Sequence, residues 1–192
     1  GSTPCAPTTS AASAMMPSVC ESATESPSPA AWTGVPRVPT RSVARSMAAA
    51  TIAAIVAFIG PWEGRRYTAY QDIVGVWTIC EGHTKGVKAG DVATDAQCDE
   101  MAAQDVAEHN AGIRACITRP MPQNVEIAFT SLAFNAGVGA FCGSTALRRY
   151  NAGDDTGACD ALNMWVRAGG KVVKGLVNRR AAESALCKKD ST

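Results

Sequence analysis

The hydrophobic pattern of the chain is dominated near its start by one charge-free run, from Ser46 to Trp62, which follows Arg41 and Arg45. The run holds seventeen residues rich in alanine, which is the short limit for a segment that crosses a bilayer. Three interpretations are open: a core helix, a cleaved signal peptide, or a weak and reversible signal-anchor. Cleavage at the end of the run would remove the helix that leads into Glu63, so we favour the core helix and the anchor. These two are compatible, because one segment can first serve as an anchor and later pack into the fold.

After this run, the pattern changes to one short β-rich segment and then to helices. Tyrosine, valine, isoleucine and tryptophan residues favour a small β-hairpin over 67–80. Thr94 and Gln97 form a capping box at the start of a helix, and Pro122 suits a first helical position. The expected helices cover 94–112, 122–136, 144–151, 156–168 and 174–188. The predicted fold class is α+β and mainly helical, with a small β-hairpin lobe and a larger helical lobe that flank a cleft.

Residues 1–45 have a different composition, rich in serine, threonine, alanine and proline, with no hydrophobic periodicity. Such a segment cannot bury enough apolar surface to offset the entropy of ordering it. We therefore expect a flexible tail over 1–45, an apolar helix over 46–62 and the main domain over 63–192. Gly1 and Ser2 resemble a cloning scar and carry no weight here.

Charge and cysteine content narrow the class of protein. The net charge of +1 argues against a general nucleic-acid binder, which would carry a basic stripe. Eight cysteines indicate disulfides in an oxidising compartment. No Cys-x2-Cys motif is present and the two histidines do not lie at ligand spacing, so we expect no metal and no cofactor.

Eight cysteines allow 105 connectivities, so any pairing is one choice among many. Cys98 and Cys116 would lie near opposite ends of the expected helix, about 20 Å apart, which is beyond disulfide reach. The favoured pairs are Cys159 with Cys187, Cys116 with Cys142 and Cys80 with Cys98, which leaves Cys5 and Cys20 to pair within the tail.

Candidate chemistry is concentrated in sixteen residues that contain Glu63, Asp72 and Thr78. Cleavage of a glycosidic bond needs a protonated acid beside the leaving oxygen and a second carboxylate that helps water attack. Glu63, at the end of an apolar helix, suits the acid, because partial burial raises the pKa of a carboxyl group. Asp72 on the hairpin suits the positioning of water, and the hydroxyl of Thr78 can hold the same water. On composition alone, a surface glutamate and a turn aspartate would be the simpler interpretations.

The segment from Trp62 to Thr84, with Gly-Val-Trp-Thr-Ile-Cys-Glu-Gly-His-Thr at its end, resembles the phage-type lysozymes of glycoside hydrolase family 24, especially signal-arrest-release endolysins. Further motifs follow in the same order. They are Ala-Phe-Asn-Ala-Gly-Val-Gly-Ala-Phe at 133–141, Ser-Thr-Ala-Leu-Arg-Arg-Tyr-Asn-Ala-Gly at 144–153, Trp-Val-Arg-Ala-Gly-Gly at 165–170 and Gly-Leu-Val-Asn-Arg-Arg at 175–180. The likeness covers about 46–188. It implies a lysozyme-like fold in which Glu63, Asp72 and Thr78 form the catalytic triad.

The resemblance also assigns supporting roles. It implies that Asn135 lines the cleft and contacts sugar, and that His83 is buried against Asp105. Arg180, or Arg179 in its place, would approach Glu63, and an opposite charge lowers the pKa of a carboxyl group. His109 is expected at the surface.

The prediction is a phage endolysin: a muramidase that cuts the β-1,4 bond between N-acetylmuramic acid and N-acetylglucosamine of bacterial peptidoglycan, for host lysis. We expect a monomer that is exported to the host periplasm, does not bind nucleic acid, and associates transiently with the inner membrane through 46–62 before release. The alternatives are a lytic transglycosylase, which needs one acid and neither Asp72 nor Thr78, and a non-catalytic, membrane-associated envelope-binding protein.

Overall fold

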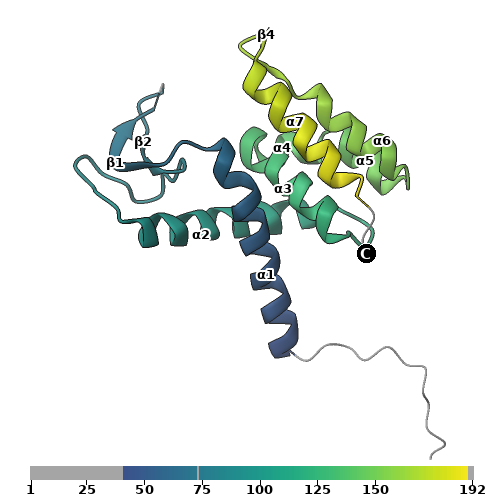
Figure 1. The fold of residues 1–192 in the computed structure, drawn as a ribbon, viewed down its shortest axis with the longest axis horizontal. Helices are drawn as coiled ribbons and strands as arrows, with labels where there is room; N and C mark the ends of the chain where they lie inside the picture. The colour runs from purple at the N-terminus through teal and green to yellow at the C-terminus, as the bar shows by residue number, and fades with distance from the viewer. Residues whose placement is uncertain (1–40, 73, 190–192) are drawn as a thin grey trace, which may run out of the picture. The chain divides into compact units, whose positions relative to one another are not determined.

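The computed structural model describes residues 41–72 and 74–189. The expected tail, including the Cys5–Cys20 pair, therefore lies outside the described residues except for its last five positions. The helices are α1 (Arg41–Ile59), α2 (Asp95–Arg114), α3 (Gln123–Ala136), α4 (Val138–Cys142), α5 (Thr145–Asn151), α6 (Asp155–Ala161) and α7 (Lys174–Cys187), with 3-10 helices η1 (Gly60–Trp62) and η2 (Leu162–Met164). The strands are β1 (Arg66–Gln71), β2 (Trp77–Cys80), β3 (Arg167–Ala168) and β4 (Lys171–Val172). Figure 1 shows their arrangement.

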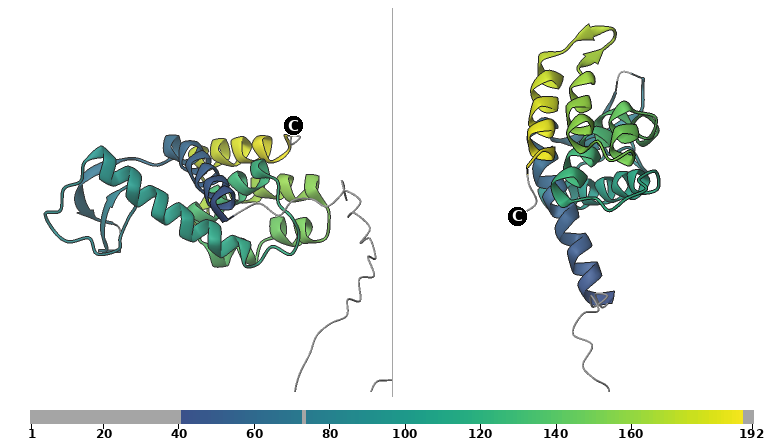
Figure 2. Two further views of the ribbon diagram at one scale, coloured as in Figure 1. Left: turned by 90° about the horizontal axis from the view of Figure 1, so that it is seen from below. Right: turned by 90° about the vertical axis from the view of Figure 1, so that its right-hand side faces the viewer.

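Helix α1 begins at Arg41, five residues before the apolar run. Its second half packs on α2 and α3 through Ile55 and Ile59, which are buried with Val106. The alanines at 48–50 are exposed, and the first turns of α1 stand clear of the other helices in Figures 1 and 2. Within the described ranges, no helix combines the length and the hydropathy that a membrane crossing needs.

The small lobe is an antiparallel hairpin of β1 and β2 at the N-terminal end of α2 (Figure 1). The register pairs Tyr70 with Thr78 and Gln71 with Trp77, and an irregularity follows toward Arg66. Among the described residues, the buried apolar cluster of this lobe has four members: Ile79, Cys80, Ala93 and Cys98. Such a small core cannot hold the hairpin by apolar burial alone.

The helical lobe has the larger core, built on α3 and covered by α4–α7. Phe129 of α3 is fully buried and stacks at 5.1 Å from Phe141 and 5.3 Å from Tyr150, measured between ring centroids. Gly137 ends α3 with φ of +93°, a conformation that glycine adopts without steric cost. The fold class expected from the sequence is confirmed: mainly helical, with a small hairpin lobe.

Three disulfides join the described cysteines, and each is a pair favoured from the sequence. Cys80–Cys98 joins the end of β2 to α2, Cys116–Cys142 joins the end of α2 to α4, and Cys159–Cys187 joins α6 to α7.

Two local predictions were wrong. The helix expected over 156–168 ends at Ala161 and continues as 3-10 helix only to Met164; the chain then forms the hairpin β3–β4. Gly169 and Gly170 form its two-residue turn with φ of +54° and +77°, which matches the favoured turn of tight hairpins. The short helix α4 was also not among the expected helices.

Candidate functional site

Glu63 lies where the helical segment of the N-terminal region ends. Pro61 favours the start of the 3-10 turn η1, and Glu63 caps this turn with extended backbone and an N–H that donates to the Gly60 carbonyl at 3.2 Å. Its side chain is 21% exposed. The carboxylate is therefore partly withdrawn from water at the edge of the cleft.

Arg179 of α7 holds this carboxylate. Its Nη1 donates to Glu63 Oε1 at 2.6 Å, while Nη2 donates to the Ser131 carbonyl at 3.2 Å. Arg179 is only 4% exposed, so the ion pair is largely shielded from solvent. No hydrogen bond from a described residue reaches Glu63 Oε2.

The sequence named Arg180 first as the neighbour of Glu63 and allowed Arg179 to take its place; the direct contact belongs to Arg179. Successive helical residues point about 100° apart, and Arg180 is turned to Asn135 Oδ1, at 3.3 Å, and to Glu183 Oε1, at 3.0 Å. Arg180 therefore acts on Glu63 electrostatically, without a hydrogen bond to it, and it orients the amide of Asn135.

Both arginines meet Glu183, which is fully buried and accepts a hydrogen bond from the Ser131 hydroxyl at 2.6 Å. Burial raises the pKa of Glu183, against the opposing effect of Arg180 and Arg179. Burial likewise lowers the pKa of Arg180 to about 10, against the attraction of Glu183. The network is a buried arrangement of charged groups behind Glu63.

A cleft of about 410 Å³ opens in front of Glu63. Asn135 and Phe134 of α3 line it on one side, and Asp105, Glu108 and His109 of α2 line another, together with the turn after β2. His109 was expected at the surface; it is half-buried, and its ring stacks on Phe134 at 5.0 Å between centroids. Asn135 and Glu63 thus share one cleft, as the resemblance implied.

Asp72 and Thr78 are held on the hairpin and do not line this cleft. Asp72 Oδ1 accepts hydrogen bonds from the N–H groups of Val74 and Val76, both at 2.9 Å, so this carboxylate organises the turn. Its Oδ2 accepts none from the described residues. Thr78 is buried, and its hydroxyl donates to the Val76 carbonyl at 3.0 Å.

The structure brings His83 and Asp105 together. His83 Nδ1 lies 2.9 Å from Asp105 Oδ2, and its Nε2 lies 3.1 Å from the Lys85 carbonyl. Both ring nitrogens are engaged, so this histidine joins the turn after β2 to α2 and supports the cleft wall.

Sequence reasoning missed three charged residues that line the cleft, Glu81, Lys85 and Glu108, and it missed Arg65, which contacts Glu81. Glu108 forms an exposed ion pair with Lys85 across the cleft edge. Arg65 contacts Glu81 across the start of the small lobe. No motif marks these positions, because an isolated charge in a sequence has no recognisable partner until the chain folds.

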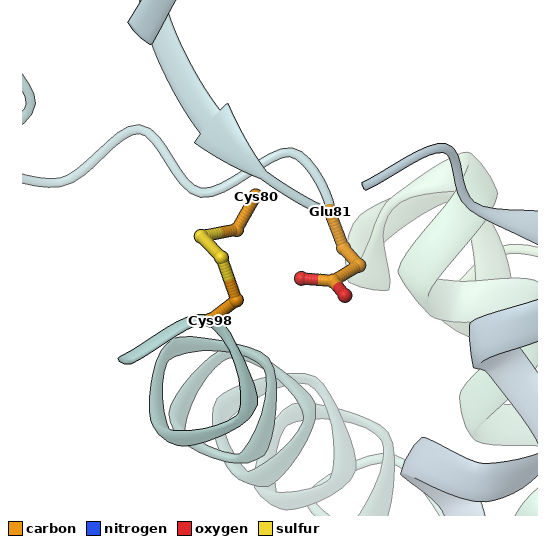
Figure 3. Close-up of side chains that lie close together, drawn as sticks. All are labelled: Cys80, Glu81 and Cys98. Atoms are coloured by element: carbon orange, nitrogen blue, oxygen red, sulfur yellow. A yellow bond between two sulfur atoms is a disulfide. The ribbon is translucent and has the colours of Figure 1, made fainter. Parts of the chain in front are cut away.

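Glu81 lies beside the disulfide of Cys80 and Cys98, with potential ligand atoms of all three residues within 4.8 Å (Figure 3). The two sulfur atoms are bonded to each other and are not free thiolates, so this group does not offer the donor set of a thiolate metal site. A larger cavity, of about 980 Å³, lies away from Glu63, between the start of α3 and the Cys159–Cys187 disulfide.

Comparisons with known proteins identify the fold and the family. Residues 60–183 match the phage lysozyme family. A SAR-endolysin of Enterobacteria phage P21 is 44% identical over 126 residues, which is 65% of this chain and 76% of the relative.

Solved structures agree. The muramidase domain of SpmX from Asticaccaulis excentricus has a TM-score of 0.67 at 33% identity, covering 71% of this chain and 96% of that domain. A mutant of the P22 lysozyme has a TM-score of 0.65 at 34% identity, covering 71% and 97%. The chain belongs to the phage lysozyme family, and it is a glycoside hydrolase of the lysozyme type. The resemblance seen in the sequence is confirmed.

Proposed function

We propose that this lysozyme is a phage endolysin that hydrolyses the β-1,4 bond between N-acetylmuramic acid and N-acetylglucosamine in the peptidoglycan of the host, so that the cell lyses. The observation that carries the proposal is the carboxylate of Glu63, held by a buried arginine at the mouth of a cleft with one oxygen unoccupied. The endolysin and muramidase names of the relatives support the same substrate.

Glu63 acts as the general acid. A saccharide in the cleft displaces water from Glu63, and removal of water disfavours a charged carboxylate. The protonated Oε2 then donates to the leaving oxygen of the glycosidic bond. Arg179 holds the other oxygen, so the carboxyl group keeps its orientation before and after the transfer.

Asp72 and Thr78, which lie on the hairpin outside the Glu63 cleft, hold the water that attacks a sugar chain extending from the cleft to the hairpin. Asp72 is fixed by two backbone N–H groups on Oδ1, and Oδ2 is left to accept a hydrogen bond from that water. The Thr78 hydroxyl supports the same water in exchange for its bond to the Val76 carbonyl. Asn135, oriented by Arg180, contacts the sugar from the α3 wall of the Glu63 cleft.

The enzyme acts in the host periplasm, where its disulfides form, and the run over 46–62 tethers it to the inner membrane before release. The SAR-endolysin name of the relative and the exposed alanines of α1 support this order of events. Cell fractionation tests it: the newly made protein should sediment with membranes and later appear in the periplasmic fraction. Recovery only in the cytosol would contradict it.

A turbidity assay on permeabilised Gram-negative cells tests the acid. Glu63→Gln removes the proton donor but keeps the shape of the side chain, and we expect lysis to slow by about 10²–10⁴-fold. Glu100→Gln, on the exposed face of α2, is the matched control and should lyse cells at the normal rate. Thermal unfolding of both variants checks that the fold survives. Lysis at the normal rate by Glu63→Gln would refute the assignment.

A further inference from the structure

Three residues, Glu63, Gly64 and Arg65, carry the chain from η1 to the first strand of the small lobe. A Cβ atom added to Gly64 would meet nothing within 4 Å, so packing does not fix this residue, and glycine has the widest choice of backbone conformations. We call this three-residue connection the crossover, and Arg179 holds its first residue, Glu63. The direction of the crossover therefore depends on what holds its last residue, Arg65.

Arg65 is held there by three carboxylates. Its Nε donates to Glu81 at 2.5 Å, its Nη1 to Asp95 at 2.9 Å and its Nη2 to Asp99 at 2.6 Å. Asp95 and Asp99 belong to the first turns of α2, and Glu81 follows β2. These hydrogen bonds raise the pKa of Arg65 further above its usual range, so the side chain remains a cation. The planar guanidinium is suited to such a fork of acceptors, and a lysine is not.

Glu81 is the least exposed of the three carboxylates, at 10%, and it lines the same cleft as Glu63. Its Oε2 is buried and receives no hydrogen bond from the described residues. The preceding residue, Cys80, has φ of +57° and is fixed to Cys98 by a disulfide (Figure 3). Glu81 is therefore a constrained anion, and Arg65 is its cationic partner in the described part of the chain.

We propose that Arg65 is a positioning residue for Glu63: it fixes the far end of the crossover and neutralises Glu81, another carboxylate that lines the cleft. The proposal rests on the proposed role of Glu63 as the general acid. It has two consequences, one for the position of Glu63 and one for its charge, and these can be separated by the choice of substitution.

The electrostatic consequence follows from the groups that face Glu63. From α7, Arg179 contacts it and Arg180 acts through its charge, with Glu183 between them. From α2, Asp105, Glu108 and His109 line the cleft; Asp105 is engaged by His83 and Glu108 by Lys85. Each acidic neighbour thus has a partner of its own. Loss of Arg65 would leave Glu81 as an unopposed anion and would favour the protonated form of Glu63.

Four variants separate position from charge: Arg65→Met, Arg65→Lys, Glu81→Gln and the double variant Arg65→Met/Glu81→Gln. Arg148→Met is the matched control, since Arg148 is an exposed arginine on α5 away from the cleft. The measurement is the pH profile of peptidoglycan hydrolysis, with kcat and KM separated at each pH and the folded fraction checked by circular dichroism.

Arg65→Met should lower kcat about tenfold and move the alkaline limb of the profile to higher pH, by on the order of half a unit. The double variant should return the limb to its normal place, because both charges are gone, while kcat recovers only in part. Arg65→Lys should leave the limb in place and lower kcat a few fold, since one ammonium group cannot reach three carboxylates. The control should match the unmodified enzyme.

A purely structural role for Arg65 predicts a different pattern. Activity would then fall in proportion to the folded fraction, the limb would not move, and Glu81→Gln would not restore it. That result would overturn the proposal.

A second measurement does not depend on activity. Carbon-13 NMR of labelled glutamate carboxyl groups follows the titration of Glu63 directly, and the signal that disappears in Glu63→Gln identifies it. In Arg65→Met the Glu63 titration should move to higher pH and return in the double variant. An unchanged titration would overturn the inference, whereas absence of hydrolysis by the unmodified enzyme with a shifted titration would refute only the proposed function.

Discussion

The helical lobe and the small lobe hold charged groups around Glu63 in opposite ways. Behind Glu63, Arg179, Arg180 and Glu183 are buried and enclosed by a large apolar core. On the other side, Arg65 is partly exposed, and two of its carboxylate partners, Asp95 and Asp99, are mostly in water. The buried network is shielded from solvent, and loss of one of its charges is strongly destabilising. Each exposed ion pair of Arg65 contributes little to stability, so its loss is tolerated more easily.

The difference extends to how each lobe is stabilised. The helical lobe buries aromatic and aliphatic side chains from α2 to α6 and η2, whereas the described part of the small lobe has four buried apolar residues, two of which are the disulfide partners Cys80 and Cys98. The acid is therefore fixed from the rigid side, while Asp72 and Thr78 sit on the side that depends on a covalent link and on turn hydrogen bonds. We expect perturbations of the two lobes to give different signatures.

Arg179→Met should have the largest effect on stability. It leaves Glu63 and the buried Glu183 without a shared cation, and breaking a buried pair costs about 3–5 kcal/mol. Urea unfolding measures the loss. Arg149→Met, which removes an exposed arginine paired to Asp154 at 3.8 Å, is the control and should cost less than about 1 kcal/mol. Equal losses in the two variants would show that burial of the network does not matter.

Cys80→Ser/Cys98→Ser should have the next largest effect. A link between residues 18 apart contributes about 3 kcal/mol, and here it also supplies half of the buried cluster of the small lobe. Amide hydrogen exchange should accelerate in the hairpin and leave α3 protected. Cys159→Ser/Cys187→Ser, within the helical lobe, should instead accelerate exchange in α6 and α7. Uniform acceleration in both variants would contradict the division into two lobes.

Glu183→Gln should change how stability depends on pH. Burial raises the pKa of Glu183 above its usual 4.5, so the folded chain holds this proton more tightly than the unfolded chain. The contribution of Glu183 to stability is therefore complete below the unfolded pKa and declines as pH rises through the folded pKa. Relative to Glu183→Gln, the unmodified protein should lose stability as pH rises above the unfolded pKa of 4.5. A relative gain over that range would reverse the sign of the assignment.

Lys85→Met should have the smallest effect. The Lys85–Glu108 ion pair is exposed on both sides and should contribute less than about 1 kcal/mol to stability. The difference from the unmodified protein should shrink further in 0.5 M salt, by screening. A loss of several kcal/mol would mean that the small lobe depends on this pair more than its exposure indicates.

Local signals explain how much of the fold could be predicted. The capping box at Thr94 and the glycine at 137 gave helix ends close to those observed, since caps act within a few residues. The prediction of a helix up to residue 168 was wrong, because two successive glycines are compatible with a helix stop and also with the tight turn of a hairpin. Propensity alone does not separate these two cases.

The site was predictable to the extent that it depends on motif spacing. Asn135 and Glu63 line one cleft and His83 contacts Asp105, whereas Asp72 and Thr78, expected to act with Glu63, do not line that cleft. The choice between Arg179 and Arg180 depends on the rotation of α7 against Glu63, which the sequence does not contain. The Arg65 contacts join residues 16 to 34 positions apart, so only the folded chain reveals them.

The central claim is that Glu63 donates a proton while water attacks the sugar. Mass spectrometry of muropeptides released by the enzyme tests it most directly, because hydrolysis adds one water across the cut bond. We expect products that end in reducing N-acetylmuramic acid from the unmodified enzyme and a loss of these products in Glu63→Gln. Products lighter by one water, with an anhydro sugar at their end, would contradict hydrolysis and identify a lytic transglycosylase.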